Sequence, residues 1–170
     1  MPNKLTLAAL LVGLALFGQA CAGPLEQART AYEQRDYATA LRLFRPLADQ
    51  GNAVAQHGLG IMYSSGDGVP RDASEAAKWY RLAAEQGNTV AQYSLAYLYV
   101  TGQGVPEDYV QAHKWYDLAI TSAMSVRANS SNDQQGLGLL IGYRDALAAK
   151  MTPAQIAEAE MLAREWKPKQ

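Results

Sequence analysis

The 170-residue sequence has few of the features that mark common chemistries. Its single cysteine excludes an internal disulfide and a cysteine-based zinc site. Fifteen Lys and Arg residues against sixteen Asp and Glu residues give a formal net charge of −1, without the basic excess that binds nucleic acid or anionic lipid. With 18% charged and 49% hydrophobic residues, the composition is that of a globular chain rather than a disordered one. We therefore expect a packed protein that does not bind nucleic acid.

Catalytic and cofactor motifs are also missing. The sequence has no Gly-x-Ser-x-Gly elbow, no P-loop and no obvious pair of glycosidase carboxylates. His57 and His113 have no metal-ligating partner three or four positions away, so we expect both to be surface or groove residues. The glycine-rich segment 136–142 has the wrong spacing for a dinucleotide fingerprint and follows no predicted strand. We therefore expect no enzyme activity, no cofactor and no bound metal.

The N-terminal segment is typical of export. After Lys4, the apolar run from Leu5 to Phe17 is thirteen residues long, short of the roughly 20 that span a bilayer as a helix. Ala20-Cys21-Ala22 then places small residues where signal peptidase cleaves. We predict a signal peptide over residues 1–22 and a periplasmic or secreted mature protein without a transmembrane span. In the alternative, Cys21 is the lipidated first residue of an anchored lipoprotein, although the usual Leu three positions earlier is absent.

A repeat of 36 residues organises the rest of the chain. Residues 51–86 and 87–122 align without a gap and share 18 of 36 positions. In the first unit, Ala55, Leu59 and Tyr63 recur every fourth residue, and Trp79 belongs to a second stripe with the i, i+3, i+4, i+7 spacing of an amphipathic helix. The two stripes therefore predict that each unit forms two antiparallel helices with a core of small alanines and large aromatic rings.

The residues between these stripes are of the types that begin and end helices. Asp72 and Asp108 stand where side chains cap a second helix, and Asn52 and Asn88 stand where they cap a first helix. Gly51 and Gly87 close second helices, a position that favours a left-handed residue. The segments 66–70 and 102–106 predict a repeated glycine-rich loop between the two helices of each unit.

The pattern resembles the Sel1-like repeats, relatives of the tetratricopeptide repeats. The first full unit carries the family motif, which in this sequence reads Ala55, Leu59-Gly60, Tyr63, Gly66-Asp67-Gly68-Val69, Asp72, Ala76, Trp79-Tyr80, Ala83-Ala84 and Gly87. The earlier segment from Ala28 to Gln50 has only three residues between Tyr32 and Asp36 and resembles a plain tetratricopeptide unit acting as a cap. The resemblance implies an all-α fold: a right-handed α-solenoid of stacked helix pairs.

The domain organisation follows from these units. A cap unit covers about 24–50, two repeats cover 51–86 and 87–122, C-terminal helices cover about 123–166, and a tail covers 167–170. Residues 129–133 form a polar, turn-prone break. Helical periodicity resumes after it and predicts a helix from about Gln135 to Lys150. A capping box at Thr152 to Gln155 opens a last helix that ends near Trp166.

A short helical solenoid presents a rigid surface on which exposed residues vary freely, which favours binding. We expect a monomeric adaptor or scaffold that binds a protein or peptide through the concave face lined by the first helices. By resemblance to tetratricopeptide units, the groove positions are Glu26, Thr30, His57, Ile61, Tyr93 and Tyr97. In the alternative, these rings pack against a neighbouring helix, which favours contact through the convex face and a structural part in an envelope assembly. A third hypothesis is a binder of cell-wall fragments with weak hydrolase-like activity, which would use the tyrosines.

Overall fold

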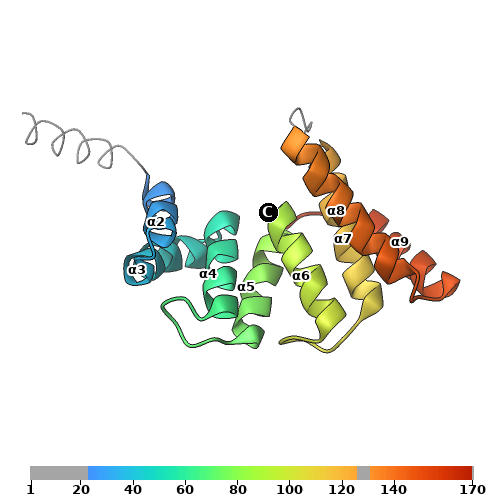
Figure 1. Ribbon diagram of the computed structural model, residues 1–170, viewed down its shortest axis with the longest axis horizontal. Coiled ribbons are helices and arrows are strands. Elements are labelled where there is room, and N and C mark those ends of the chain that lie inside the picture. Colours follow the sequence, from blue (N-terminus) through green and yellow to red (C-terminus); the bar gives the residue numbers. More distant parts are fainter. Residues whose placement is uncertain (1–22, 126–130, 170) are drawn as a thin grey trace, which may run out of the picture.

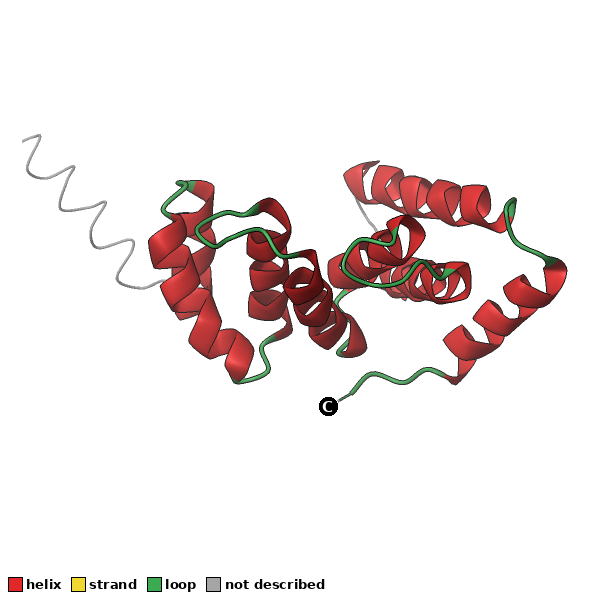
Figure 2. Cartoon of the chain, turned by 90° about the horizontal axis from the view of Figure 1, so that it is seen from below, coloured by secondary structure: helices red, strands yellow, loops and turns green. Residues whose placement is uncertain are grey.

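The computed structural model describes residues 23–125 and 131–169. All regular structure within these ranges is helical (Figure 2). The predicted signal peptide, Cys21 and part of the predicted break near 129 lie outside the described residues. The helices are α2 (Pro24–Glu33), α3 (Tyr37–Asp49), α4 (Ala53–Ser65), α5 (Ala73–Glu85), α6 (Thr89–Thr101), α7 (Tyr109–Ser125), α8 (Ser131–Ala148) and α9 (Pro153–Glu165).

The helices form a row of pairs, as the repeat predicts. Helix α2 packs on α3, α4 on α5 and α6 on α7, and the pairs are joined through contacts of α3 with α4 and of α5 with α6 (Figure 1). Each pair therefore touches mainly its neighbours along the row. The all-α solenoid is confirmed.

Side chains cap the helices at the predicted positions. The Asn52 and Asn88 side chains accept hydrogen bonds from the backbone N–H groups of the third residues of α4 and α6. The Asp72 carboxylate accepts from two backbone N–H groups of α5, and Asp108 accepts from one in α7. Gly51 and Gly87 have φ values of 89° and 88°, the left-handed conformation expected after a second helix.

Two tryptophans anchor two core clusters. Trp79 lies in the cluster that contains Phe44 of the preceding unit and Leu59 and Met62 of its own first helix. The Arg45 guanidinium of α3 lies 5.4 Å from the centre of its ring. Trp115 lies in the second cluster and meets the Trp166 ring edge-on, with centroids 6.3 Å apart.

Buried glutamines join successive units, a role that the sequence analysis did not assign. The Gln56 side-chain amide donates to the Ala48 carbonyl at 3.1 Å, and the equivalent Gln92 donates to the Ala84 carbonyl at 3.3 Å. Each glutamine thus bonds a carbonyl near the C-terminal end of the preceding helix. Because helix C-termini leave carbonyls without intrahelical partners, this bond stabilises the junction between units.

The C-terminal helices depart from the repeat. Helix α8 already includes Ser131, inside the predicted polar break and before the predicted start near Gln135. The Thr152 capping box of α9 is confirmed. Both α8 and α9 pack against α7 rather than forming a close pair with each other.

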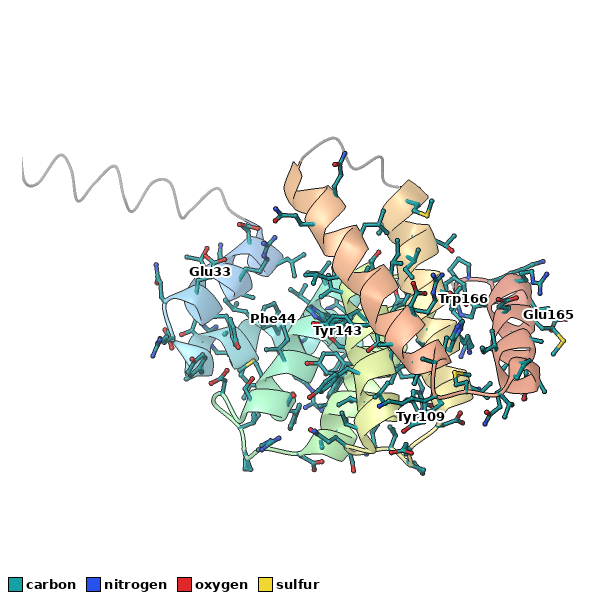
Figure 3. All side chains as sticks on the ribbon, turned by 45° about the vertical axis from the view of Figure 1, so that its right-hand side comes forward. Glu33, Phe44, Tyr109, Tyr143, Glu165 and Trp166 are labelled. Carbon is teal, nitrogen blue, oxygen red and sulfur yellow. The ribbon has the colours of Figure 1, made fainter. Side chains whose placement is uncertain are left out.

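After α9 the chain turns back along the solenoid. The Lys169 backbone N–H donates to the Glu85 carbonyl at 2.8 Å, and the Lys169 ammonium pairs with the Glu85 carboxylate at 2.7 Å. Trp166 lies between α7 and α9 (Figure 3). We call residues 166–169 the C-terminal strap.

Candidate functional site

A pocket of about 390 Å³ opens between α2 and α4, with α6 at one side. It is lined by Arg29, Tyr32, Glu33, Phe44, Val54, His57, Gly58, Ile61, Asn88 and Val90. Gly58 lets the Phe44 ring approach closely, since a Cβ atom at this position would lie 3.0 Å from the ring. Phe44 therefore contributes a hydrophobic wall to what we call the α2–α4 pocket.

The pocket has an apolar interior and one charged side. Val54 and Val90 expose apolar side chains at the pocket. Burial lowers the pKa of His57, so its imidazole is neutral at pH 7. Arg29 and Glu33 lie one helical turn apart on α2 and supply opposite charges. This arrangement suits one or two apolar side chains of a ligand beside a polar backbone.

A bond to the interhelical loop fixes the Tyr32 side of the pocket. The Tyr32 hydroxyl donates to the Asp67 carboxylate at 2.8 Å, and burial together with this carboxylate raises the pKa of Tyr32 to about 12. The glycine-rich loop 66–70 thus positions a side chain of the pocket, a role that the sequence analysis did not foresee.

The six predicted groove residues do not form one site. His57 and Ile61 lie together in the α2–α4 pocket. Glu26 is exposed and its carboxylate lies 3.7 Å from the Arg29 guanidinium, whereas Thr30 is half-buried and outside the pocket lining. Tyr93 and Tyr97 lie further along the solenoid, on α6. Their part in binding stays a prediction.

Tyr93 belongs to a separate group of three aromatic rings, one from each of three helices. The Tyr93 ring lies 6.1 Å from that of Tyr116 on α7 and 5.8 Å from that of Tyr143 on α8, and Tyr116 and Tyr143 stack at 6.3 Å. Tyr97, one turn further along α6, is 47% exposed. We call Tyr93, Tyr116 and Tyr143 the tyrosine cluster. Tyr143 lies outside the repeat, so its place in the cluster had no signal in the repeat pattern.

A larger and more charged cleft of about 780 Å³ lies between α7, α8 and α9. Asp117 on its wall faces the His113 Nδ1 atom at 3.1 Å and the Arg144 guanidinium at 3.4 Å. His113 was expected at the surface or in a groove but is only 3% exposed, because α8 and its arginine cover this side of α7. His113 is therefore a buried residue beside Asp117 of the same helix, and the Asp117–Arg144 ion pair joins α7 to α8.

The described residues contain neither a metal-binding cluster nor a membrane-spanning helix. No group of three or more His, Cys, Asp or Glu side chains is placed to hold a metal ion in residues 23–125 and 131–169. None of the helices in those ranges is both long enough and apolar enough to cross a membrane.

Comparison with known proteins agrees with the helix pairs. A model of the Sel1 repeat matches residues 30–52, 53–88 and 89–123. One similar structure is a protective antigen of uropathogenic Escherichia coli strains with an SLR fold, 31% identical over 84% of this chain, with a TM-score of 0.69. Another is a Sel1 repeat protein from Oxalobacter formigenes, 31% identical over 66% of this chain, with a TM-score of 0.56.

The matched part covers 29% of the E. coli antigen and 44% of the Oxalobacter protein, so both relatives are much longer than the region they share with this chain. No curated relative matches the sequence. Because three successive copies of the repeat account for more than half of the residues, the chain belongs to the Sel1 repeat family.

Proposed function

We propose that this protein is an exported adaptor that binds a protein or peptide through the face formed by α2, α4 and α6. Sel1 repeat proteins generally mediate protein–protein interactions, and the fold is typically a non-enzymatic scaffold. The observation that carries the proposal is the α2–α4 pocket, because it joins an apolar cavity to exposed valines on two first helices.

The energetics of the pocket favour an anchor side chain. A buried aliphatic or aromatic side chain contributes about 1.5–3 kcal/mol through the apolar area that it removes from water. Interfaces concentrate their affinity in such filled pockets and surround them with weaker contacts. Arg29 and Glu33 would add polar contacts at the rim, where they select a partner more than they strengthen binding.

Peptide selection followed by two matched variants tests the proposal. Random peptides are panned against the purified chain, and the affinity of the selected peptides is measured by calorimetry. Val90→Arg places a charge in the pocket at a residue that is 56% exposed, and we expect it to weaken binding at least about tenfold. Leu82→Arg is the control, because Leu82 is also exposed but lies on α5, outside the pocket lining.

The control variant Leu82→Arg also distinguishes binding in the pocket from the alternative, contact through the second helices. Loss of binding in Leu82→Arg with unchanged binding in Val90→Arg would refute the pocket and favour contact through the second helices, as in a structural envelope component.

Export is tested on its own. We expect a mature N-terminus at Gly23 and recovery of the protein in the periplasmic or secreted fraction, because residues 20–22 form a signal peptidase site. N-terminal mass spectrometry that found a diacylated Cys21 in the membrane fraction would replace this expectation with lipoprotein anchoring.

A further inference from the structure

We propose that Asp49, Gly51 and Trp79 form a site for an extended partner segment that carries a tryptophan and, three positions later, a lysine. The inference starts from the C-terminal strap, which shows how such a segment lies against the following unit. It goes beyond the α2–α4 pocket, because these residues belong to the end of α3, the turn after it, and α5.

The strap is bound at a site formed by Glu85, Gly87 and Trp115, which we call the strap site. The Trp166 ring meets the Trp115 ring edge-on, and a Cβ atom added to Gly87 would lie 3.9 Å from the Trp166 ring. The Lys169 backbone N–H donates to the Glu85 carbonyl, and the Lys169 ammonium pairs with the Glu85 carboxylate. The strap thus contacts this site through a tryptophan and a lysine three positions apart.

The repeat places the same kinds of residue one unit earlier. Asp49, Gly51 and Trp79 stand 36 positions before the residues of the strap site, and we call them the counterpart site. Like Glu85, Asp49 is the last residue of its helix, so its carbonyl has no partner within the helix. The Arg45 guanidinium joins the counterpart site, because it lies 5.4 Å from the centre of the Trp79 ring and 3.3 Å from the Asp49 carboxylate. A carboxylate and a tryptophan are therefore close together here, as in the strap site.

The counterpart site is open where the strap site is covered. Apart from the chain neighbours of Gly51, no atom of the described residues lies within 4 Å of a Cβ atom added to this glycine. In the strap site, the Trp166 ring occupies this place. The Asp49 side chain is 53% exposed, against 23% for Glu85 beneath the strap. A partner tryptophan can therefore lie over Gly51 while a lysine of the same segment reaches Asp49.

A partner lysine has to replace Arg45 at the Asp49 carboxylate. The equivalent Arg81 shows where the arginine can go, because its guanidinium donates to the Tyr99 hydroxyl at 2.7 Å while the strap lysine pairs with the acid of the strap site. Tyr63 stands at the position of Tyr99 in the first unit. Both side chains of the Arg45–Asp49 pair are about half exposed, and such surface pairs contribute little to stability. The exchange therefore costs little.

The occupant is a segment of a partner protein rather than the strap of a second copy. Helix α9 packs against α7 and the strap follows α9 directly, so the high effective concentration within one chain keeps each strap at its own site. Charge selects the partner segment further, because a cation complements Asp49 whereas an acidic segment would meet its carboxylate. The strap of a second copy is an outcome of the test.

The probe is an acetylated and amidated peptide that copies residues 164–169, titrated into the purified chain by calorimetry at low ionic strength. We expect saturable binding that Asp49→Asn weakens about threefold to fivefold, because the lysine loses its counter-charge. The fold should persist, since Asp49 is exposed and an acid at a helix C-terminus is unfavourable. The matched control is Glu85→Gln, which makes the same change in the strap site and should leave the peptide affinity within about twofold. Alanine in place of the peptide tryptophan should weaken binding at least about tenfold.

Three results would overturn the inference. The first is absence of peptide binding at millimolar concentration, or equal affinity for Asp49→Asn and the unaltered chain. The second is loss of binding in Glu85→Gln but not in Asp49→Asn, which would mean that the peptide displaces the strap and that copies of the chain exchange straps. The third is loss of binding in Val90→Arg, which would place the peptide in the α2–α4 pocket. Unchanged binding of this peptide by Val90→Arg, together with loss of the pocket-selected peptides, would support two separate sites.

Discussion

Replacement of Trp79 tests how the first repeat is joined to the cap unit. Trp79 is only 9% exposed, and its ring packs among Phe44, Leu59 and Met62. Truncation of such a buried ring to alanine costs about 3–5 kcal/mol in transfer energy and cavity formation. A domain of ordinary stability has only about 5–15 kcal/mol to lose, so Trp79→Ala should remove about a fifth of it or more.

Trp79→Phe should behave quite differently. The smaller ring loses on the order of 40 Å² of buried area, or about 1 kcal/mol. The indole Nε1–H is buried and has no hydrogen-bond partner among the described residues, and the cost of such a donor is about 1–3 kcal/mol. Because phenylalanine removes this cost, we expect its stability to lie within about 1 kcal/mol of the original.

Urea denaturation followed by circular dichroism measures both variants, with Leu82→Ala as an exposed control expected to change stability by less than about 0.5 kcal/mol. A large loss of stability in Trp79→Phe would mean that the indole N–H is satisfied in solution. An unchanged stability in Trp79→Ala would refute the core assignment itself.

Three further predictions follow from caps, titration and the C-terminal strap. Asp72→Ala should cost about 1 kcal/mol in thermal unfolding through the lost cap, whereas Asp72→Asn should keep most of the stability; equal losses would count against the cap. Because burial raises the pKa of Tyr116 to about 12 in the folded protein, its contribution to stability is complete below pH 10 and is lost as pH rises toward 12. The difference in phenolate absorbance at 295 nm between the unaltered chain and Tyr116→Phe isolates this residue among the ten tyrosines, and a difference that appears near pH 10 in the folded protein would contradict the prediction. Trp166→Ala should lower the free energy of unfolding by about 2 kcal/mol and speed amide hydrogen exchange in α9 but not in α4. Equally faster exchange in both helices would disprove a local role.

The helices were predictable because their signals are local. Asn52, Asp72 and Thr152 cap helices that begin at the next residue, and the apolar stripes repeat with the helical period. Such signals depend on three or four neighbouring residues, which the sequence displays directly.

The misjudged residues depend on contacts between distant segments. His113 is buried because α8 covers it, and α8 lies outside the repeat whose packing the pattern predicts. Gln56 and Gln92 occupy the same repeat position, and this identity was the available signal for the junction bonds.

The candidate site was predictable only in part for the same reason. Spacing placed His57 and Ile61 on one face of a helix, and the pocket contains both. It did not reveal Phe44, which reaches the pocket from α3, or Tyr143, which joins Tyr93 from α8. Residues supplied by other helices complete each surface, and their positions follow from the stacking of units.

The C-terminal strap changes how cooperatively this solenoid unfolds. A linear row of helix pairs has low contact order, so its ends fray and its units melt in sequence. The bond between Lys169 and Glu85 links residues 84 positions apart and closes a loop over α6 to α9. Opening any helix in this loop strains the closure, whereas α2 to α5 lie outside it. The protein should therefore have a C-terminal half that unfolds as one unit and an N-terminal end that exchanges its amide protons independently.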